Sequence, residues 1–450
     1  MRYIPTTEHE RKEMLESIGV DSIAELFADV PPKIVLNEPL PLPEALSEAE
    51  LVRHMEQLAE KNLNLTEIVS FMGAGSYDHL IPSIVKHLIS RGEFLTAYTP
   101  YQAEISQGVL QSIFEYQSLI AEITGMEAAN ASMYDGATAL AEAALMACGV
   151  TRRDLVVLPD TLHPEWREVV QLYLDNQDVE IQYVPYDPET GTIDHDALHT
   201  ADLEKAACVV VQQPNFFGLL EDAQPVGDLI HDKGGLFIMA VDPISLGLLK
   251  SPGELGADIV VGDGQSLGNT MSFGGPTVGF FATNGAKLIR RMPGRIVGET
   301  VDEHGNRGYV LTLQTREQHI RREKATSNIC SNQALNALAA SIYLSVIGKE
   351  GFKDVAYQCL QKTNYLKTRM CEIDALTIPF SAPSFREFVV EGDVDWEEVN
   401  LRLLEHGFLG GLPLKRFGFG WERYALFAVT EARTKEEMDS FIQVLRGLIE

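Results

Sequence analysis

One aspartate directly follows a wholly apolar segment. Residues Leu236–Val241 are all apolar, and Asp242 comes next. Such a run predicts a buried strand of a parallel sheet, and ligands bind at the carboxyl ends of these strands. Asp242 is therefore a candidate ligand-binding carboxylate. The alternative is a structural carboxylate that caps the turn after a core strand.

The next predicted strand lacks the residue that would complete a cofactor site. In pyridoxal-phosphate enzymes of the aminotransferase-like class, such an Asp pairs with the pyridinium nitrogen, and a lysine after a later strand forms the Schiff base. Here Ile259–Val261 leads into Gly262-Asp263-Gly264-Gln265-Ser266, which contains no lysine. Gln and Ser side chains cannot form an imine. Lys250 precedes this strand, so we expect it to lie away from the pocket.

Two tyrosines and several polar side chains share one short segment, Ala97–Gly108, with the sequence AYTPYQAEISQG. Aromatic rings with a polar end, on a loop fixed by proline, suit the wall of a ligand site or an interface. The candidates are Tyr98, Tyr101 and Gln102. The alternative is a structural turn with the tyrosines packed at its edge.

Two other segments carry groups suited to an anion. Met133–Thr138 places a glycine turn at a helix start, where backbone amides can hold an anion; a plain helix start is the alternative. Thr326, Ser327 and Asn328 are consecutive hydrogen-bonding residues. Residues 286–324, just before them, hold nine Lys or Arg and five Asp or Glu. This excess predicts a solvated basic face, a subunit contact or a phosphate-facing edge.

The elements that must position these residues predict an α/β fold. Short apolar runs separated by helical stretches indicate a mainly parallel sheet buried on both faces. These runs are Leu155–Leu158, Ile181–Val184, Cys208–Val211, Leu236–Val241, Ile259–Val261 and Val278–Phe281. After Gly348 a second pattern predicts a small α+β domain. It consists of a helix near Lys353–Ile373, a strand Phe385–Val390, a helix Trp396–His406, a strand Tyr424–Val429 and a last helix after Thr434.

The first 65 residues predict a helical arm. Thr7-x-x-Glu10, Ser22-x-x-Glu25 and Ser47-x-x-Glu50 match the capping box, and Gly19 is placed to end the first helix. The prolines between Pro31 and Pro43 favour an extended path. We therefore expect an arm (1–65), a large α/β domain (66–347) and a small α+β domain (348–450).

Composition excludes several classes of function. The chain has 36 Lys or Arg against 65 Asp or Glu, a net charge of −29, so its surface would repel nucleic acid. The excess acid indicates a self-repelling surface, or docking of a cationic partner as the alternative. Five scattered cysteines without a CxxC pair predict reduced thiols in a cytoplasmic protein. No apolar run reaches 18 residues and no basic n-region opens the chain, so we expect neither a membrane span nor secretion.

Further motifs are missing from the sequence. There is no HExxH or clustered His/Asp set, so no metal site is predicted. There is no GxGxxG after the first strand and no GxxxxGK[ST], so nicotinamide and nucleoside-triphosphate sites lose their main support.

Taken together, the chain resembles the glycine cleavage system P-protein family, in the form where the amino-terminal half is a separate subunit 1, or alpha subunit. The resemblance rests on segments spread over almost the whole length. They are Met1–Pro5, Ser70–Gly75, Tyr98–Gly108, Ala129–Ser132, Val261–Ser266 and Ala325–Cys330. In this family the cofactor lysine lies in the other half or subunit. Aligned without gaps, that lysine falls at Ser266 and the preceding histidine at Gln265.

The resemblance implies a shared activity. The large domain would be of the aminotransferase-like fold type I, with Asp242, Gln265 and Ser266 as vestigial cofactor positions. Pyridoxal phosphate would be held by the partner, glycine dehydrogenase subunit 2 (beta subunit), and none would be bound covalently by this chain. The complex would decarboxylate glycine and pass the aminomethyl group to the lipoylated H-protein, alongside the T- and L-proteins. Alone, this subunit would be inactive.

Individual roles follow from the same resemblance. Tyr98, Tyr101 and Gln102 would line the substrate pocket of the partner, and Thr326, Ser327 and Asn328 would contact its cofactor phosphate. Two other functions stay open. One is a non-catalytic scaffold or regulatory subunit, and the other is a free-standing pyridoxal-phosphate lyase that uses Lys250.

Overall fold

The computed structural model describes residues 5–36, 38, 40–325 and 327–450. Its contacts divide the chain into two units, Met1–Leu63 and Asn64–Glu450. Among the described residues no helix is both long enough and apolar enough to cross a membrane.

The first unit consists of short helices joined by extended chain. They are α1 (Glu8–Ile18), η1 (Ile23–Phe27), η2 (Pro32–Ile34) and α2 (Glu48–Ala59). The capping boxes at Thr7 and Ser47 are confirmed, and Gly19 ends α1 with φ of 86°. The predicted box at Ser22 is wrong, because η1 is a short 3₁₀ helix with no side-chain cap; the Ser22 hydroxyl bonds to Glu25 instead. None of these helices has a buried residue in its described part.

The second unit is built on a mainly parallel sheet, as predicted. In the part of the chain that the structure describes it has seven strands, ordered β2-β8-β7-β6-β5-β3-β4. The strands are β2 (Ala128–Ala129), β3 (Leu155–Pro159), β4 (Glu180–Val184), β5 (Ala206–Gln213), β6 (Leu236–Val241), β7 (Ile259–Asp263) and β8 (Gly279–Thr283). Within this described sheet β8 alone runs against the other strands, antiparallel to its neighbours β2 and β7.

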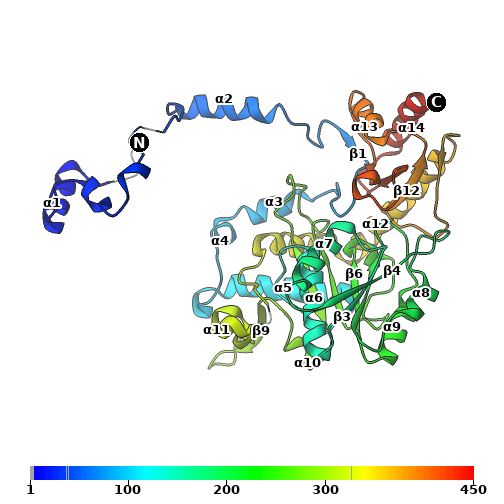
Figure 1. Cartoon of the computed structure of the whole chain (residues 1–450), viewed down its shortest axis with the longest axis horizontal. Coiled ribbons are helices and arrows are strands. Elements are labelled where there is room, and N and C mark those ends of the chain that lie inside the picture. The colour runs from blue at the N-terminus through cyan, green and yellow to red at the C-terminus, as the bar shows by residue number, and fades with distance from the viewer. Residues whose placement is uncertain (1–4, 37, 39, 326) are drawn as a thin grey trace. The chain divides into compact units, whose positions relative to one another are not determined.

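Alternating side chains bury both faces of this sheet. In β5, Val209 and Val211 pack with one core and Cys208 and Val210 with the other. The first core includes side chains of α5, α9 and α12, and the second includes those of α6 and α7. Figure 1 shows the ribbons of these helices around the strands of the sheet. These helices are α5 (Gln107–Thr124), α6 (Gly136–Thr151), α7 (Pro164–Leu174), α9 (Ala223–Asp232) and α12 (Ala334–Met370). We call the sheet with these helices, residues 103–370, the large domain.

Shorter elements complete the large domain and the segment before it. They are β1 (Val69–Ser70), α3 (Ser83–Ile89), α4 (Gly92–Leu95), η3 (Ala103–Ile105), α8 (His195–Thr200), η4 (Pro243–Gly247), α10 (Ala286–Ile289), β9 (Ile296–Val301), β10 (Arg307–Thr312), η5 (Gln314–Arg316), α11 (Gln318–Arg321) and η6 (Arg322–Lys324).

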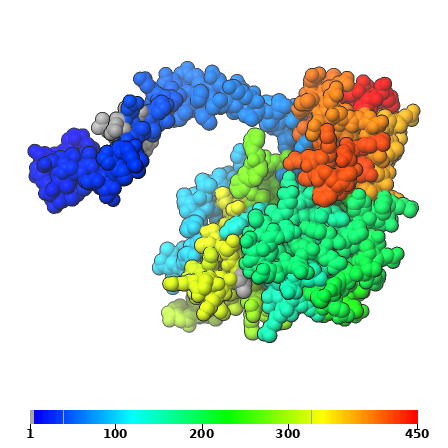
Figure 2. Space-filling model, in the orientation of Figure 1, coloured from blue at the N-terminus to red at the C-terminus, as the bar shows by residue number. Residues whose placement is uncertain are grey.

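A four-stranded antiparallel sheet of order β11-β12-β15-β14 forms the small domain, residues 376–450, within the described chain. Its elements are β11 (Leu376–Thr377), β12 (Glu387–Gly392), α13 (Trp396–Leu404), β13 (Phe408–Leu409), β14 (Leu412–Pro413), η7 (Leu414–Phe417), β15 (Tyr424–Ala428) and α14 (Lys435–Ile449). The space-filling view shows this domain, orange to red, lying against the green large domain (Figure 2).

Two features lie at the predicted boundaries. Gly348, with φ of 60° and ψ of −175°, interrupts α12 where the sequence pattern changes. Near the other boundary, β1 pairs in parallel with β13, so residues 69 and 70 join a strand of the small domain rather than the large sheet.

Candidate functional site

The carboxyl ends of β6 and β7 meet around one buried arginine. Arg386 comes just before β12, and its Nε lies 2.8 Å from Oδ2 of Asp242, the residue after β6. Its two terminal nitrogens donate to the hydroxyl of Ser266 at 3.2 and 3.3 Å. Arg386 is only 3% exposed. The parallel sheet brings Asp242 and Ser266 close to each other, but a guanidinium fills the space between them.

Gln265, the third position that the resemblance predicts, makes structural hydrogen bonds. Its Oε1 accepts a hydrogen bond from the amide of Tyr77 at 2.9 Å, and its Nε2 donates to the carbonyls of Tyr77 and Asn269. This pairing holds the Tyr77 ring under the guanidinium, with Cζ of Arg386 3.3 Å from the ring centroid. The amide of Gln265 therefore supports the loop that packs on Arg386.

Burial and neighbouring charges set the protonation of this cluster. Burial alone would lower the pKa of Arg386, but the facing Asp242 raises it, so the guanidinium carries its charge. The hydroxyl of Tyr77 donates to Oε2 of Glu387 at 2.7 Å, and burial raises the pKa of both groups. The cluster thus contains one buried cation next to two carboxyl groups and a neutral phenol.

The anion-binding position predicted at Met133–Thr138 is taken by carboxylates of the chain itself. Asp135 caps α6, accepting a hydrogen bond from the amide of Thr138 at 2.7 Å. Oδ2 of Asp263 accepts one from the amide of Gly136 at 3.1 Å, and its Oδ1 accepts from Thr277 and from the amide of Gln265. Burial raises the pKa of Asp263 to about 6 in spite of these donors. The segment is therefore a helix start whose amides are already paired with carboxylates.

The tyrosine segment lies at a separate surface hollow. Tyr98 is 80% exposed, and its hydroxyl lies 3.3 Å from that of Ser331. Tyr101 is 55% exposed, and its hydroxyl accepts a hydrogen bond from Arg295 at 3.1 Å. Gln102 is exposed beside them, at the start of η3. Tyr98, Arg295 and Asn332 line this cavity of about 240 Å³, which we call the tyrosine hollow. It is suited to a polar ligand or to a side chain from a partner.

Arg295 is the residue of this hollow that sequence reasoning missed. It is buried, its Nη1 donates to Asn332 at 3.5 Å, and its guanidinium lies 5.5 Å from the centre of the Tyr101 ring. Its other neighbour is Glu317, 4.0 Å from Nε. Ser331 and Asn332 directly follow the segment Ala325–Cys330, so an extension of that motif by two residues would have included them.

The predicted phosphate-contacting residues face a different hollow. Thr326 lies outside the described residues. Ser327 is half-buried, and its hydroxyl accepts a hydrogen bond from the amide of Ile329 at 3.1 Å, whereas Asn328 is exposed. Both line a hollow that also contains Glu142 and Arg322. Burial raises the pKa of Glu142 to about 7, although a hydrogen bond with Ser327 opposes this.

The turn after β7 connects the cluster around Arg386 with the hollow beside Tyr98. Asn269, at the end of this turn, donates from its side chain to the carbonyl of Asn336 at 3.3 Å. Asn336 lies on α12 and lines the tyrosine hollow. Lys250, in contrast, is exposed in the segment between η4 and β7 and is not among the residues that line the Arg386 cavity.

Comparisons with known proteins give matches over almost the whole chain. The family model described as glycine cleavage system P-protein matches residues 1–445. A relative from Desulfitobacterium hafniense, named probable glycine dehydrogenase (decarboxylating) subunit 1, is 53% identical over 442 residues and covers 98% of each chain. A crystal structure of glycine decarboxylase (P-protein) of the glycine cleavage system, in inhibitor-bound form, superimposes with a TM-score of 0.90 at 44% identity, covering 100% of both chains.

This chain belongs to the glycine cleavage system P-protein family. The sequence resemblance is thereby confirmed. A sphingosine-1-phosphate lyase structure from Burkholderia pseudomallei, 15% identical with a TM-score of 0.67 over 93% of each chain, shares the fold alone. The large domain of this P-protein chain is accordingly of the fold type I of pyridoxal-phosphate enzymes, as predicted.

The residues of this P-protein chain do not fit the cofactor that the fold implies. Ser266 offers no amine, and Asp242 is already paired with Arg386. The carboxylates of Asp135 and Asp263 at the start of α6 would repel a phosphate. The remaining cavity is about 50 Å³, far below the ~300–1,000 Å³ of typical small-molecule sites. Among the described residues at this edge of the sheet, pyridoxal phosphate therefore has neither an anchor nor space.

Proposed function

We propose that this chain is subunit 1 of a two-subunit glycine decarboxylase and that it completes an active site whose cofactor is held by its partner. The observation that carries the proposal is that Arg386 occupies the position between Asp242 and Ser266. A member of this family with its own cofactor position filled by a side chain needs a second subunit for pyridoxal-phosphate chemistry.

The partner in this proposal is glycine dehydrogenase subunit 2, the beta subunit. Its pyridoxal phosphate would supply the electron sink for the loss of CO2 from glycine. The aminomethyl group would pass to the lipoyl disulfide of the H-protein, and the T- and L-proteins would complete the system. We expect the complex in the cytoplasm, which is consistent with five free cysteines in the described chain.

The tyrosine hollow is the part of this chain that we assign to the shared site. Tyr98 and Tyr101 expose their rings, while the buried Arg295 and the half-buried Asn332 fix the wall behind them. We propose that Tyr98, Tyr101 and Gln102 face the substrate of the partner, and that Thr326, Ser327 and Asn328 face its cofactor phosphate. Closing the site with a subunit would exclude water, which protects a reactive intermediate.

Reconstitution tests this proposal. The chain, the partner co-purified with it from its native cell, lipoylated H-protein and pyridoxal phosphate are assayed for glycine-dependent CO2 exchange. We expect exchange only when both subunits are present. A partner that is fully active without this chain would reduce the chain to a scaffold or regulator. Borohydride trapping of cofactor on Lys250 would instead make it a lyase of its own.

A further inference from the structure

Arg386 connects three segments that lie far apart in the sequence. It belongs to the segment that leads into β12 of the small domain. Its guanidinium contacts Asp242 and Ser266, at the carboxyl ends of two neighbouring strands of the large domain, and His79 in the loop before α3. This side chain joins the small domain to the edge of the large sheet, beside the apolar core that Phe217 shares with Trp421 and the backbone hydrogen bond from Phe385 to Gly218 at 3.0 Å.

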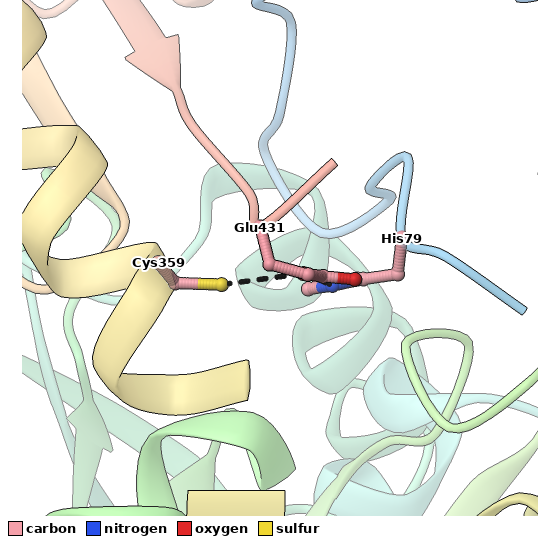
Figure 3. Close-up of side chains that lie close together, drawn as sticks. All are labelled: His79, Cys359 and Glu431. Atoms are coloured by element: carbon pink, nitrogen blue, oxygen red, sulfur yellow. Dashed lines mark hydrogen bonds and ion pairs between the residues drawn. The ribbon is translucent and has the colours of Figure 1, made fainter. Parts of the chain in front are cut away.

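His79 extends the contact deeper into the small domain. A guanidinium can only donate hydrogen bonds, so Nε2 of His79 accepts the bond of 2.6 Å from Arg386. Nδ1 then carries the proton and donates to Glu431 at 2.6 Å. Figure 3 shows His79 and Glu431 side by side, with Cys359 of α12 pointing at the same carboxylate, 3.5 Å from it. The result is a continuous path from Asp242 through Arg386 and His79 to Glu431.

This protonation pattern argues against a metal ion. The ligand atoms of His79, Cys359 and Glu431 lie within 4.8 Å of one another, as a metal site would require. However, the imidazole nitrogen that faces the cluster carries a proton, and burial raises the pKa of the Cys359 thiol far above its usual value. The cluster is therefore a hydrogen-bonded support for Arg386.

The charges in this path depend on one another. Asp242 and Arg386 form an ion pair with side chains 12% and 3% exposed, and the side chain of Glu431 is 7% exposed. Removal of one member of a buried pair leaves an uncompensated charge and strongly destabilises the fold. Without Arg386, Asp242 would lose its counter-ion and His79 would lose its donor.

We propose that Arg386 is a permanent lock between the two domains: its guanidinium fills the vestigial cofactor position and holds the small domain in one fixed arrangement against the large domain. The chain would then keep its shape without any ligand. This inference rests on contacts within the chain and not on the proposed function. Its test needs neither partner nor glycine, so its failure would leave the proposed function standing.

Hydrogen exchange on the purified full chain tests the lock. In Arg386→Met we expect the amides of residues 77–80, 242–247 and 386–391 to exchange at least about tenfold faster than in the wild type, because the two domains separate more often. The midpoint of thermal unfolding should fall by about 5 °C. The matched control is Arg153→Met, since Arg153 donates to two backbone carbonyls, of Ala206 and Lys233, within the large domain. It should leave exchange in residues 386–391 unchanged.

Unchanged exchange in Arg386→Met, or the same acceleration in Arg153→Met, would overturn the proposal. If Arg386→Met does not fold, Arg386→Lys and Asp242→Asn replace it. Lysine keeps the positive charge, but its ammonium group can contact fewer partners than the planar guanidinium of arginine. Asparagine at position 242 removes only the negative charge of the acceptor. Both should give exchange in residues 386–391 that is about threefold or more faster than in the wild type. Wild-type exchange in both variants would also refute the lock.

Discussion

The buried guanidinium of Arg295 donates a hydrogen bond to the hydroxyl of the exposed Tyr101 at 3.1 Å. A buried residue thus fixes the orientation of a ring that presents more than half of its surface to solvent. An exposed aromatic ring held in one position is suited to contact a substrate or a partner, because less entropy is lost in ordering it on binding.

The first prediction concerns this hydroxyl. Tyr101→Phe removes one hydrogen bond, which is worth ~1 kcal/mol of folding stability. If the tyrosine serves the shared site, glycine-dependent turnover of the complex should fall by about tenfold or more, because contacts made only in the transition state affect turnover. Tyr98→Phe should act in the same direction. The assay compares kcat of complexes purified to the same stoichiometry.

Tyr357→Phe is the control for hydroxyl removal. Tyr357 lies on α12, is 48% exposed and accepts a hydrogen bond from Gln361 at 2.9 Å. Its loss should leave turnover at the wild-type level. Wild-type turnover in both Tyr98→Phe and Tyr101→Phe would show that the tyrosine hollow is not part of the shared active site.

A second prediction concerns the cofactor phosphate of the partner. A hydrogen bond to a charged group is worth ~1.5–3 kcal/mol. Thr326→Ala, Ser327→Ala or Asn328→Ala should therefore weaken retention of pyridoxal phosphate by the assembled complex about tenfold or more, without loss of assembly. Equilibrium dialysis of the complex measures this affinity. The control is Ser118→Ala, since the Ser118 hydroxyl only donates to the carbonyl of Phe114 within α5. Equal affinity in all four variants would contradict the assignment.

The third prediction uses the pKa of Glu142, which burial raises from 4.5 to about 7. Between these values the folded chain binds more protons than the unfolded chain, so stability is present at low pH and is lost as the pH rises through 7. The loss amounts to about 3 kcal/mol at pH 8. Glu142→Gln should be more stable than the wild type at pH 8 and no more stable at pH 4.5. Thermal unfolding at both values checks the sign, and a wild type that gains relative stability with rising pH would contradict it.

A fourth prediction follows from the contact between Ser266 and Arg386. Ser266→Lys would put an ammonium group beside the guanidinium, at the distance where like charges repel. We expect a lower unfolding midpoint, no visible cofactor absorbance when pyridoxal phosphate is added, and no glycine decarboxylation. A misplacement of ~1 Å alone can cost on the order of 100-fold in rate. Stable cofactor binding by this variant alone would show that the vestigial position is still functional.

The sheet-edge site was predictable in part from the sequence. Parallel strands end at the same edge, so the proximity of Asp242 and Ser266 followed from two buried runs. Arg386 was not predictable, because it lies 120 residues after Ser266 in sequence and reaches the site from another domain. Tyr98 and Tyr101 were predicted on a loop and lie on one, whereas Arg295 had no local pattern to distinguish it from the other basic residues of its segment. The failed capping box at Ser22 shows that a short motif needs a regular helix behind it.

The central claim is that this chain has no decarboxylase activity by itself and is required for that of its partner. The most direct measurement is glycine-dependent exchange of labelled CO2 with lipoylated H-protein and pyridoxal phosphate, for this chain, for the partner subunit and for the two mixed. The account predicts exchange in the mixture and none above background in either subunit alone. Exchange by this chain alone, or exchange by the partner alone that equals the mixture, would contradict it.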